Sequence, residues 1–270
     1  MLLIAVAGLF LSAHARGAPI SKHPYGQWLD RKSDLERHFL EIRSDQPALA
    51  KWQHYFDVYE HHLARFRGTD VVICEVGINN GGSLALWRSY FGPRARIIGI
   101  DLFNASFMQA NPLYGSPDRV VYGDQGSAKF WAEFRAGEPR IDVFIDDGGH
   151  LPRLQMATLE EMLPHLSAGG VYATEDLVKG VTQGAEGSRA SPTVRYAVSN
   201  YVLGRDGLSS FFWPPRPQRA TKWQQQLFGV SFYPYIIVLE KLTHPRGWLR
   251  DAERGGIAKS GVRPKGTLMG

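Results

Sequence analysis

The amino-acid sequence predicts an α/β protein whose mostly parallel sheet is covered by helices on both faces. From residue 71 onward, short runs rich in Val and Ile alternate with amphipathic helical stretches. Strands that alternate with helices at this spacing are typical of a parallel sheet with crossover helices. The composition agrees, since 44% of the 270 residues are hydrophobic and 12% are aromatic, which suffices for one sizeable core.

Residues 1–20 form a candidate leader that we expect to lie outside the fold. Its apolar stretch is too short to span a bilayer comfortably. The small-x-small sequence Ala13-His14-Ala15 is typical of a signal-peptide cleavage site, whereas a positively charged start is missing. If the leader is a signal, the protein enters the secretory pathway or leaves the cytoplasm; if it is not, the protein is cytoplasmic.

Residues 21–68 are expected to form a short helical segment before the sheet. Apolar side chains recur there at steps of three and four residues in two stretches. A break with a new helix start is expected at residues 45–48, which contain a proline. His61 and His62 are adjacent, and adjacent side chains on a helix face different directions. We therefore interpret this pair as part of an exposed face and not as a metal site.

Residues 69–242 are expected to form the main domain, with its elements in regular order. Five parallel strands are expected at residues 71–76, 96–101, 119–122, 141–146 and 170–175. Helices are expected at residues 83–91, 128–135, 153–165 and 192–203, and two closing strands at 209–213 and 230–240. The single cysteine, Cys74, lies in an apolar run and is interpreted as a buried structural thiol.

Residues 243–270 are expected to form a basic, flexible tail. The chain has a net charge of +5 and a pI near 9.3. From Lys241 to the end there are seven basic and two acidic residues, so this part accounts for the whole net charge. Such tails are commonly solvated. No nucleic-acid-binding motif accompanies this one, so nucleic acid is not an expected partner. Beyond the candidate leader, no segment is expected to span a membrane.

Polar or Gly-rich clusters follow each of the five parallel strands. The carboxyl ends of parallel strands share one edge, which is where open α/β sheets bind ligands. The clusters are Glu75-Val-Gly77-Ile-Asn79-Asn-Gly-Gly-Ser83, Asp101, Asp124-Gln125, Asp146-Asp147-Gly-Gly-His150 and Glu175-Asp176. The sequence therefore predicts one functional site at this edge.

The Gly-rich turn after the first strand predicts a ligand that approaches the backbone closely and meets a helix N-terminus. It is not a P-loop, because no Gly-Lys-Ser/Thr follows, and it lacks the Gly-x-Gly-x-x-Gly spacing of a dinucleotide site. Asp101, 24 residues beyond Gly77, is placed to accept hydrogen bonds from ribose hydroxyls. The alternative is an aspartate that only caps a helix.

The acids after the fourth and fifth strands predict a cation, because so many carboxylates at one edge would otherwise repel one another. Oxygen ligands suit Mg²⁺, Mn²⁺ or Ca²⁺. Asp146 and Asp147 point opposite ways at a strand end, so only one of them is expected to face the cleft. His150 is the expected general base, because an imidazole exchanges protons near neutral pH. The alternative for the acids is helix capping and pairing with Arg or Lys.

Three blocks together resemble class I S-adenosylmethionine-dependent methyltransferases of the macrolide-sugar (mycinamicin-type) O-methyltransferase group, which has relatives called cephalosporin hydroxylases. They are residues 75–83, Ile145-Asp-Asp-Gly-Gly-His150 and Glu175-Asp176-Leu177. The resemblance runs from about residue 55 to residue 241. It implies a Rossmann-like, doubly wound, seven-stranded sheet whose last strand is antiparallel.

The resemblance also implies the roles of the site residues and the reaction. S-adenosyl-L-methionine would be bound by Glu75, Gly77, Asn79, Ser83, Asp101, Asp124, Gln125 and Asp146. Mg²⁺ (or Mn²⁺) would be held by Asp147, Glu175 and Asp176, with His150 as the base. The acceptor would be a hydroxyl of a sugar or of another small glycan-like or natural-product molecule.

This sequence departs from the group in two places. Leu-Val-Lys-Gly-Val-Thr follows Asp176 where relatives often carry a Thr-Ser-Tyr-like stretch, and the N-terminal region is shorter. Both departures leave the acceptor and the oligomeric state open, and a homo-oligomer is compatible with the resemblance.

Two alternative functions stay open on the same sheet, and a third, an iron hydroxylase, is disfavoured. An NAD-dependent oxidoreductase is the nearest alternative, but the dinucleotide fingerprint is absent and the acid cluster beside His150 would have no role. An iron hydroxylase ordinarily uses two histidines and one carboxylate, whereas only one histidine stands at this edge. A non-catalytic cofactor-binding scaffold is the second alternative, and the altered segment after Asp176 keeps it open.

Overall fold

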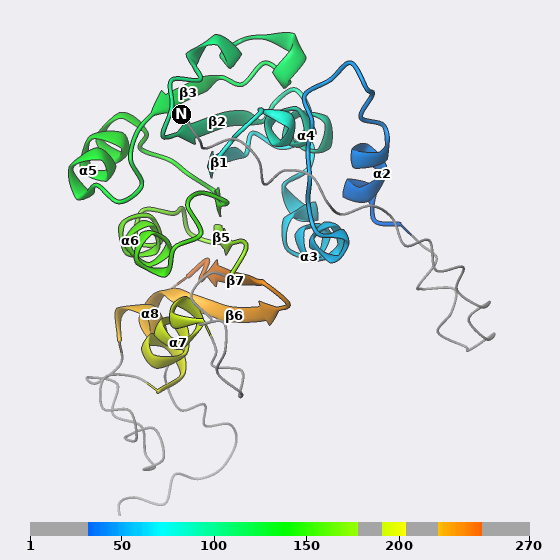
Figure 1. Cartoon of the computed structure of the whole chain (residues 1–270). Helices are drawn as coiled ribbons and strands as arrows, with labels where there is room; N and C mark the ends of the chain where they lie inside the picture. The colour runs from blue at the N-terminus through cyan, green and yellow to red at the C-terminus, as the bar shows by residue number, and fades with distance from the viewer. Residues whose placement is uncertain (1–31, 178–190, 204–220, 245–270) are drawn as a thin grey trace, which may run out of the picture.

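A computed structural model describes residues 32–177, 191–203 and 221–244 (Figure 1). Its centre is one seven-stranded sheet with the order β3-β2-β1-β4-β5-β7-β6. The strands are β1 Val72–Val76, β2 Arg96–Asp101, β3 Arg119–Tyr122, β4 Val143–Asp146, β5 Val171–Thr174, β6 Leu227–Tyr233 and β7 Ile236–Lys241. Strands β1 to β5 pair in parallel, and β7 runs antiparallel to both β5 and β6. The predicted α/β sheet with an antiparallel last strand is confirmed.

Helices cover both faces of the sheet (Figure 1). One face packs against α2 Asp34–Leu40, α3 Gln53–Leu63 and α4 Gly82–Phe91. The other packs against α5 Ala128–Gly137, α6 Pro152–Met162, α7 Pro192–Val198 and α8 Lys222–Gln226. Short 3-10 helices lie at Ala64–Phe66, Ser106–Met108 and Pro112–Tyr114, and a π-helical turn follows α7 at Ser199–Leu203. Among the residues that the structure describes, no helix is long and apolar enough to cross a membrane.

The first strand shows why the parallel strands read as continuous apolar runs. Successive side chains of a strand point to opposite faces, and here both faces are buried. Ile73 packs in the cluster under α3 and α4, whereas Cys74 packs in the cluster under α5 and α6. Cys74 is fully buried, as expected, and burial raises the pKa of its thiol well above its usual range.

The closing part of the sheet differs from the prediction. Residues 230–240 were expected to form one strand, but they belong to the β6–β7 hairpin, whose turn contains Pro234 and Tyr235. Tyr235 has a φ of +64°, a left-handed conformation that is uncommon for a bulky residue. The apolar side chains on both sides of the turn hid it in the sequence. The other expected closing strand, 209–213, lies outside the described residues, as do the candidate leader and the tail beyond residue 244.

The N-terminal segment also differs in two details. The break between its helices runs from residue 41 to residue 52, so α3 begins later than the predicted start at 45–48. His61 is exposed, but His62 is buried, and the interpretation of both as an exposed face is wrong for His62. Its Nε2 lies 2.9 Å from the Tyr233 hydroxyl oxygen, and its Nδ1 lies 3.5 Å from the Glu240 carboxylate. This burial follows because α3 packs across the β6–β7 hairpin.

Candidate functional site

The carboxyl ends of four parallel strands bring predicted site residues to one edge of the sheet. Glu75, Asp101 and Asp146 stand at the ends of β1, β2 and β4, and Glu175 follows β5 directly. All four side chains are buried. Strand order reverses between β1 and β4, which is where open α/β sheets bind ligands.

Hydrogen bonds through Asp146 and Gln125 stabilise the turn that carries Asp147 and His150. The Gln125 amide Nε2 donates to Asp146 Oδ1 at 3.1 Å, and the Gly149 N–H donates to Gln125 Oε1 at 2.6 Å. The Asp146 side chain is fully buried, and this desolvation raises its pKa to about 6. Asp147, by contrast, keeps 22% of its side chain exposed. Of the two adjacent aspartates, Asp147 therefore faces outward and Asp146 holds the turn.

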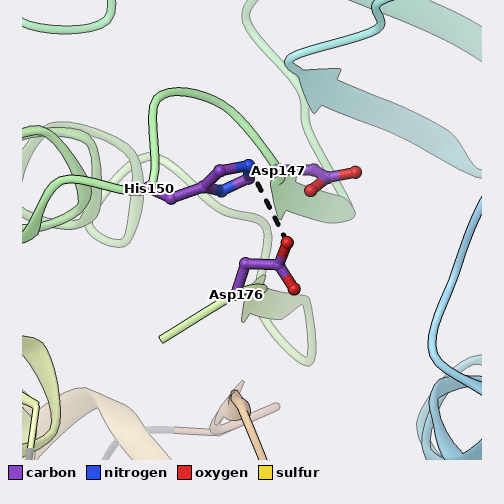
Figure 2. Close-up of side chains that lie close together, drawn as sticks. All are labelled: Asp147, His150 and Asp176. Atoms are coloured by element: carbon purple, nitrogen blue, oxygen red, sulfur yellow. Dashed lines mark ion pairs between the residues drawn. The ribbon is translucent and has the colours of Figure 1, made fainter. Parts of the chain in front are cut away.

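Asp147 belongs to two groups of potential metal ligands. One ligand atom each from Asp147, His150 and Asp176 lie within 4.8 Å of one another, and so do ligand atoms of Glu75, Asp147 and Glu175. His150 Nε2 is 3.8 Å from Asp176 Oδ2 (Figure 2). The three expected metal ligands thus reach the same edge, but Glu175 and Asp176 stand in different groups.

The second group surrounds Lys51, a residue that sequence reasoning missed. Its Nζ lies 2.6 Å from Glu175 Oε1, 2.7 Å from Asp147 Oδ2 and 3.6 Å from Glu75 Oε1. Only 2% of the Lys51 side chain is exposed. The Tyr59 hydroxyl also donates to Glu175. No local pattern marks Lys51, because its two nearest partners lie 96 and 124 residues further along the chain.

Lys51 and the three carboxylates around it shift one another's pKa values. Burial alone would lower the pKa of Lys51, but the carboxylates of Glu175, Asp147 and Glu75 outweigh it and hold that pKa well above its usual range. Lys51 is therefore an ammonium ion. Burial raises the pKa of Glu175, with Lys51 acting against this rise and Asp147 adding to it.

Asp176 is held by two aromatic residues at the start of α3. The Trp52 indole donates to Asp176 Oδ1 at 3.2 Å, and the Tyr55 hydroxyl lies 3.1 Å from the same oxygen and accepts from the Asp176 N–H at 3.2 Å. Asp176 and His150 have φ angles of +51° and +52°. Such left-handed conformations cost free energy in non-glycine residues and persist where surrounding contacts enforce them. Tyr55 is such a contact, and no signal near Asp176 in the sequence could have revealed it.

The Gly-rich turn packs directly against the Asp147 loop. Gly77 has a φ of +89°, and a Cβ at this position would lie 2.2 Å from the backbone oxygen of Asp147. Asp101 Oδ2 accepts from the Asn79 N–H at 3.0 Å, and its Oδ1 accepts from the Leu102 N–H at 2.7 Å. Asp101 thus joins the Gly-rich turn to the end of β2 and caps none of the described helices, because the N-cap of α4 is Gly81, with no side-chain hydrogen bond. Its ribose contact stays a prediction.

The remaining expected cofactor residues divide between the interior and the surface. Glu75 accepts a hydrogen bond from the Trp87 indole at 3.1 Å, and its Oε1 lies 3.6 Å from Lys51 Nζ. Ser83 is buried at the start of α4. Asn79 is exposed with a φ of +42°, and Asp124 is exposed and accepts from the Gly126 N–H at 2.8 Å.

Comparisons with known proteins agree with this architecture. No protein-family model matches the chain. It is 32% identical over 231 residues to 8-demethyl-8-(2-methoxy-alpha-L-rhamnosyl)-tetracenomycin-C 3'-O-methyltransferase of Streptomyces olivaceus, covering 80% of this chain and 56% of the relative. It is 27% identical over 246 residues to mycinamicin VI 2''-O-methyltransferase of Micromonospora griseorubida, covering 86% and 59%. The chain therefore spans a little over half the length of these curated relatives.

A solved structure shows the same fold. The MycE methyltransferase from the mycinamycin biosynthetic pathway, in complex with Mg and SAH, aligns with a TM-score of 0.58 and 24% identity. The alignment covers 78% of this chain and 55% of that one. The fold class is confirmed by this likeness, and the resemblance to macrolide-sugar O-methyltransferases is confirmed by the sequence relatives.

Proposed function

We propose that this chain, similar in sequence and fold to sugar O-methyltransferases, is an S-adenosyl-L-methionine-dependent, metal-assisted O-methyltransferase that acts on a sugar or another small glycan-like acceptor. The observation that carries the proposal is the gathering of Asp147, His150 and Asp176 within 4.8 Å at the edge where strand order reverses. The names of the relatives supply the reaction and the acceptor class.

The residues at this edge fit a hard divalent cation. The carboxylates of Asp147, Glu175 and Asp176 suit Mg²⁺ or Mn²⁺. Iron ordinarily takes two histidines with one carboxylate, whereas His150 is the one histidine in the two groups of potential ligands. Asp147 and Asp176 would hold the cation. Glu175, the third ligand expected from the sequence, would offer the cation its Oε2, because its Oε1 is the atom that Lys51 and Tyr59 contact. When bound, the cation would lower the pKa of an acceptor hydroxyl.

The chain's own residues then move one proton and position the acceptor. S-adenosyl-L-methionine supplies a methyl group on a sulfonium sulfur. In the proposed reaction the acceptor oxygen would form a bond to the methyl carbon as the carbon–sulfur bond breaks with its electron pair on sulfur, and His150 would take the hydroxyl proton. Asp176, 3.8 Å from His150 Nε2, stabilises the imidazolium that forms. Catalysis rests on positioning, because methyl transfer needs no covalent enzyme intermediate.

An aromatic pair beside Asp176 supports a sugar acceptor. The rings of Trp52 and Tyr235 lie 5.2 Å apart, and these residues keep 50% and 43% of their surface exposed. Trp52 also donates its indole N–H to Asp176. Exposed rings next to precisely placed polar groups are the lining that ligand sites use to orient partly apolar molecules. The apolar face of a sugar ring would pack on these rings while its hydroxyls face Asp147 and Asp176.

The test combines cofactor binding with the loss of one side chain. Calorimetry should show binding of S-adenosyl-L-methionine and no binding of NAD. His150→Ala should lower the rate of methyl transfer to a panel of rhamnosides by about 100-fold or more, with cofactor affinity nearly unchanged. His61→Ala, which removes an exposed histidine of α3, is the matched control.

Three results would contradict the proposal. Binding of NAD in place of S-adenosyl-L-methionine would return the chain to the oxidoreductase alternative. Full activity of His150→Ala would remove the base from the mechanism, and cofactor binding without transfer to any hydroxylated acceptor would favour the scaffold.

A further inference from the structure

Lys51 is a buried cation at the edge where a divalent metal is proposed to bind. Its Nζ contacts Asp147 and Glu175 at hydrogen-bond distance and lies 3.6 Å from Glu75. Three buried or partly buried carboxylates next to one another are unfavourable without a positive charge. Within the part of the chain that the structure describes, Lys51 is the cation recorded in contact with these three acids. It therefore holds the acid group together before any metal is present.

Asp147 is the residue that both cations need. Its Oδ2 is 2.7 Å from Lys51 Nζ, and Figure 2 shows its carboxylate pointing away from the His150 imidazole. Yet ligand atoms of Asp147, His150 and Asp176 are close enough to share one ion. A carboxylate oxygen that accepts a short hydrogen bond from an ammonium has less charge to offer a metal.

We propose that Lys51 competes with the divalent cation for Asp147, so that metal binding requires Asp147 to leave Lys51 while Lys51 stays on Glu175. This inference rests on the proposed metal site and deepens it. Lys51 is a positioning residue here, because it acts on the metal through Asp147. It lowers the affinity for the divalent cation and keeps the site assembled when that cation is absent.

The geometry gives Lys51 a place to remain once Asp147 is released. Glu175 Oε1 is 2.6 Å from its Nζ and also accepts a hydrogen bond from Tyr59. Glu175 is 1% exposed and Lys51 sits between it and Glu75. The ammonium is therefore still paired after Asp147 turns, so competition costs one ion pair and not the whole cluster.

The experiment measures Mn²⁺ binding to the full chain without cofactor or acceptor, by the electron paramagnetic resonance signal of free Mn²⁺. Lys51→Met removes the competing charge and should tighten Mn²⁺ binding by about tenfold or more. Lys51→Arg keeps the charge and the pair with Asp147, so its affinity should stay near that of the unchanged protein. The double variant Lys51→Met with Glu75→Gln removes one cation and one carboxylate, which preserves the net charge of the group and guards against misfolding.

The double variant separates competition from simple charge neutralisation. Under competition it still binds Mn²⁺ several-fold more tightly than the unchanged protein, because Asp147 is released. A return to the original affinity would overturn the inference, as would a Lys51→Met variant that binds no tighter. If neither the unchanged protein nor any variant binds Mn²⁺, the metal part of the proposed function fails. Binding by the unchanged protein without tightening in the variants refutes the competition alone.

Discussion

One oxygen atom of Tyr55 can be removed to test how the Asp176 loop is held. The Tyr55 hydroxyl contacts the Asp176 carboxylate, the Asp176 N–H and the Tyr235 carbonyl, at 3.1, 3.2 and 3.1 Å. Tyr55 is 1% exposed, so Tyr55→Phe keeps the packed ring and deletes only these bonds. The loop that carries Asp176 then loses the Tyr55 link to α3, while Trp52 still donates to the Asp176 carboxylate and Tyr59 to Glu175.

The expected loss of stability follows from the groups left behind. The Tyr235 carbonyl still accepts from the Leu177 N–H at 3.0 Å, so its cost is small. The partly buried Asp176 N–H loses the partner that the structure gives it, at a residue whose φ is already +51°. An unsatisfied, partly buried donor and one lost bond to a carboxylate together predict a decrease of about 1–3 kcal/mol in the free energy of unfolding.

Urea unfolding of Tyr55→Phe and of a matched control measures this decrease. The control is Tyr201→Phe, which deletes an exposed hydroxyl that donates to the Phe228 carbonyl at 3.0 Å, and it should lose no more than about 0.5 kcal/mol. Mn²⁺ affinity of Tyr55→Phe should also fall, because Asp176 becomes less well placed. Equal stability of the two variants would refute the account of Tyr55 as the support of this loop.

Two further predictions concern the strand ends and the hairpin. Gly77→Ala places a Cβ 2.2 Å from the Asp147 backbone oxygen, at a residue whose φ is +89°. The variant should therefore lose about 2–5 kcal/mol of the free energy of unfolding and bind Mn²⁺ more weakly. Mn²⁺ affinity equal to that of the unchanged protein would contradict this prediction. The His62 hydrogen bond, with help from Arg65, lowers the pKa of Glu240 to about 2. A lowered carboxyl pKa stabilises the fold above the unfolded pKa, and this stabilisation is lost as pH falls through about 2. Because Glu240 is partly exposed, solvent screening limits its contribution to the free energy of unfolding to about 1 kcal/mol. In Glu240→Gln, the free energy of unfolding should therefore fall less steeply between about pH 5 and pH 2. An unchanged dependence of stability on pH would contradict this prediction.

Much of the fold could be predicted because its signals are local. The second and third strands have the predicted bounds, since each apolar run is bordered by polar or turn residues. The β6–β7 hairpin carries one such local signal, Pro234, because proline within an apolar run indicates a break in the strand. Its turn at Tyr235 carries no glycine or asparagine to announce a left-handed residue, and apolar residues continue on both sides.

The site shows the same division. Asp147, His150 and Asp176 could be placed at one edge because each lies within a few residues of the end of β4 or β5, and the ends of parallel strands coincide. Lys51 and Tyr55 could not be placed, because they precede or begin a helix and meet the site only through tertiary packing. The residues around Lys51 and Tyr55 in the sequence predict a helix, but they do not predict which residues that helix contacts.

The contacts between α3 and the end of β5 have a consequence for how the chain folds. Lys51 meets Glu175 across 124 residues and Tyr55 meets Asp176 across 121. Closing a loop of that length is entropically costly, and contacts of high sequence separation slow folding. We therefore expect the acid edge to form late in folding, after the strands that carry its carboxylates have aligned, and we expect these carboxylates to repel one another until Lys51 reaches them.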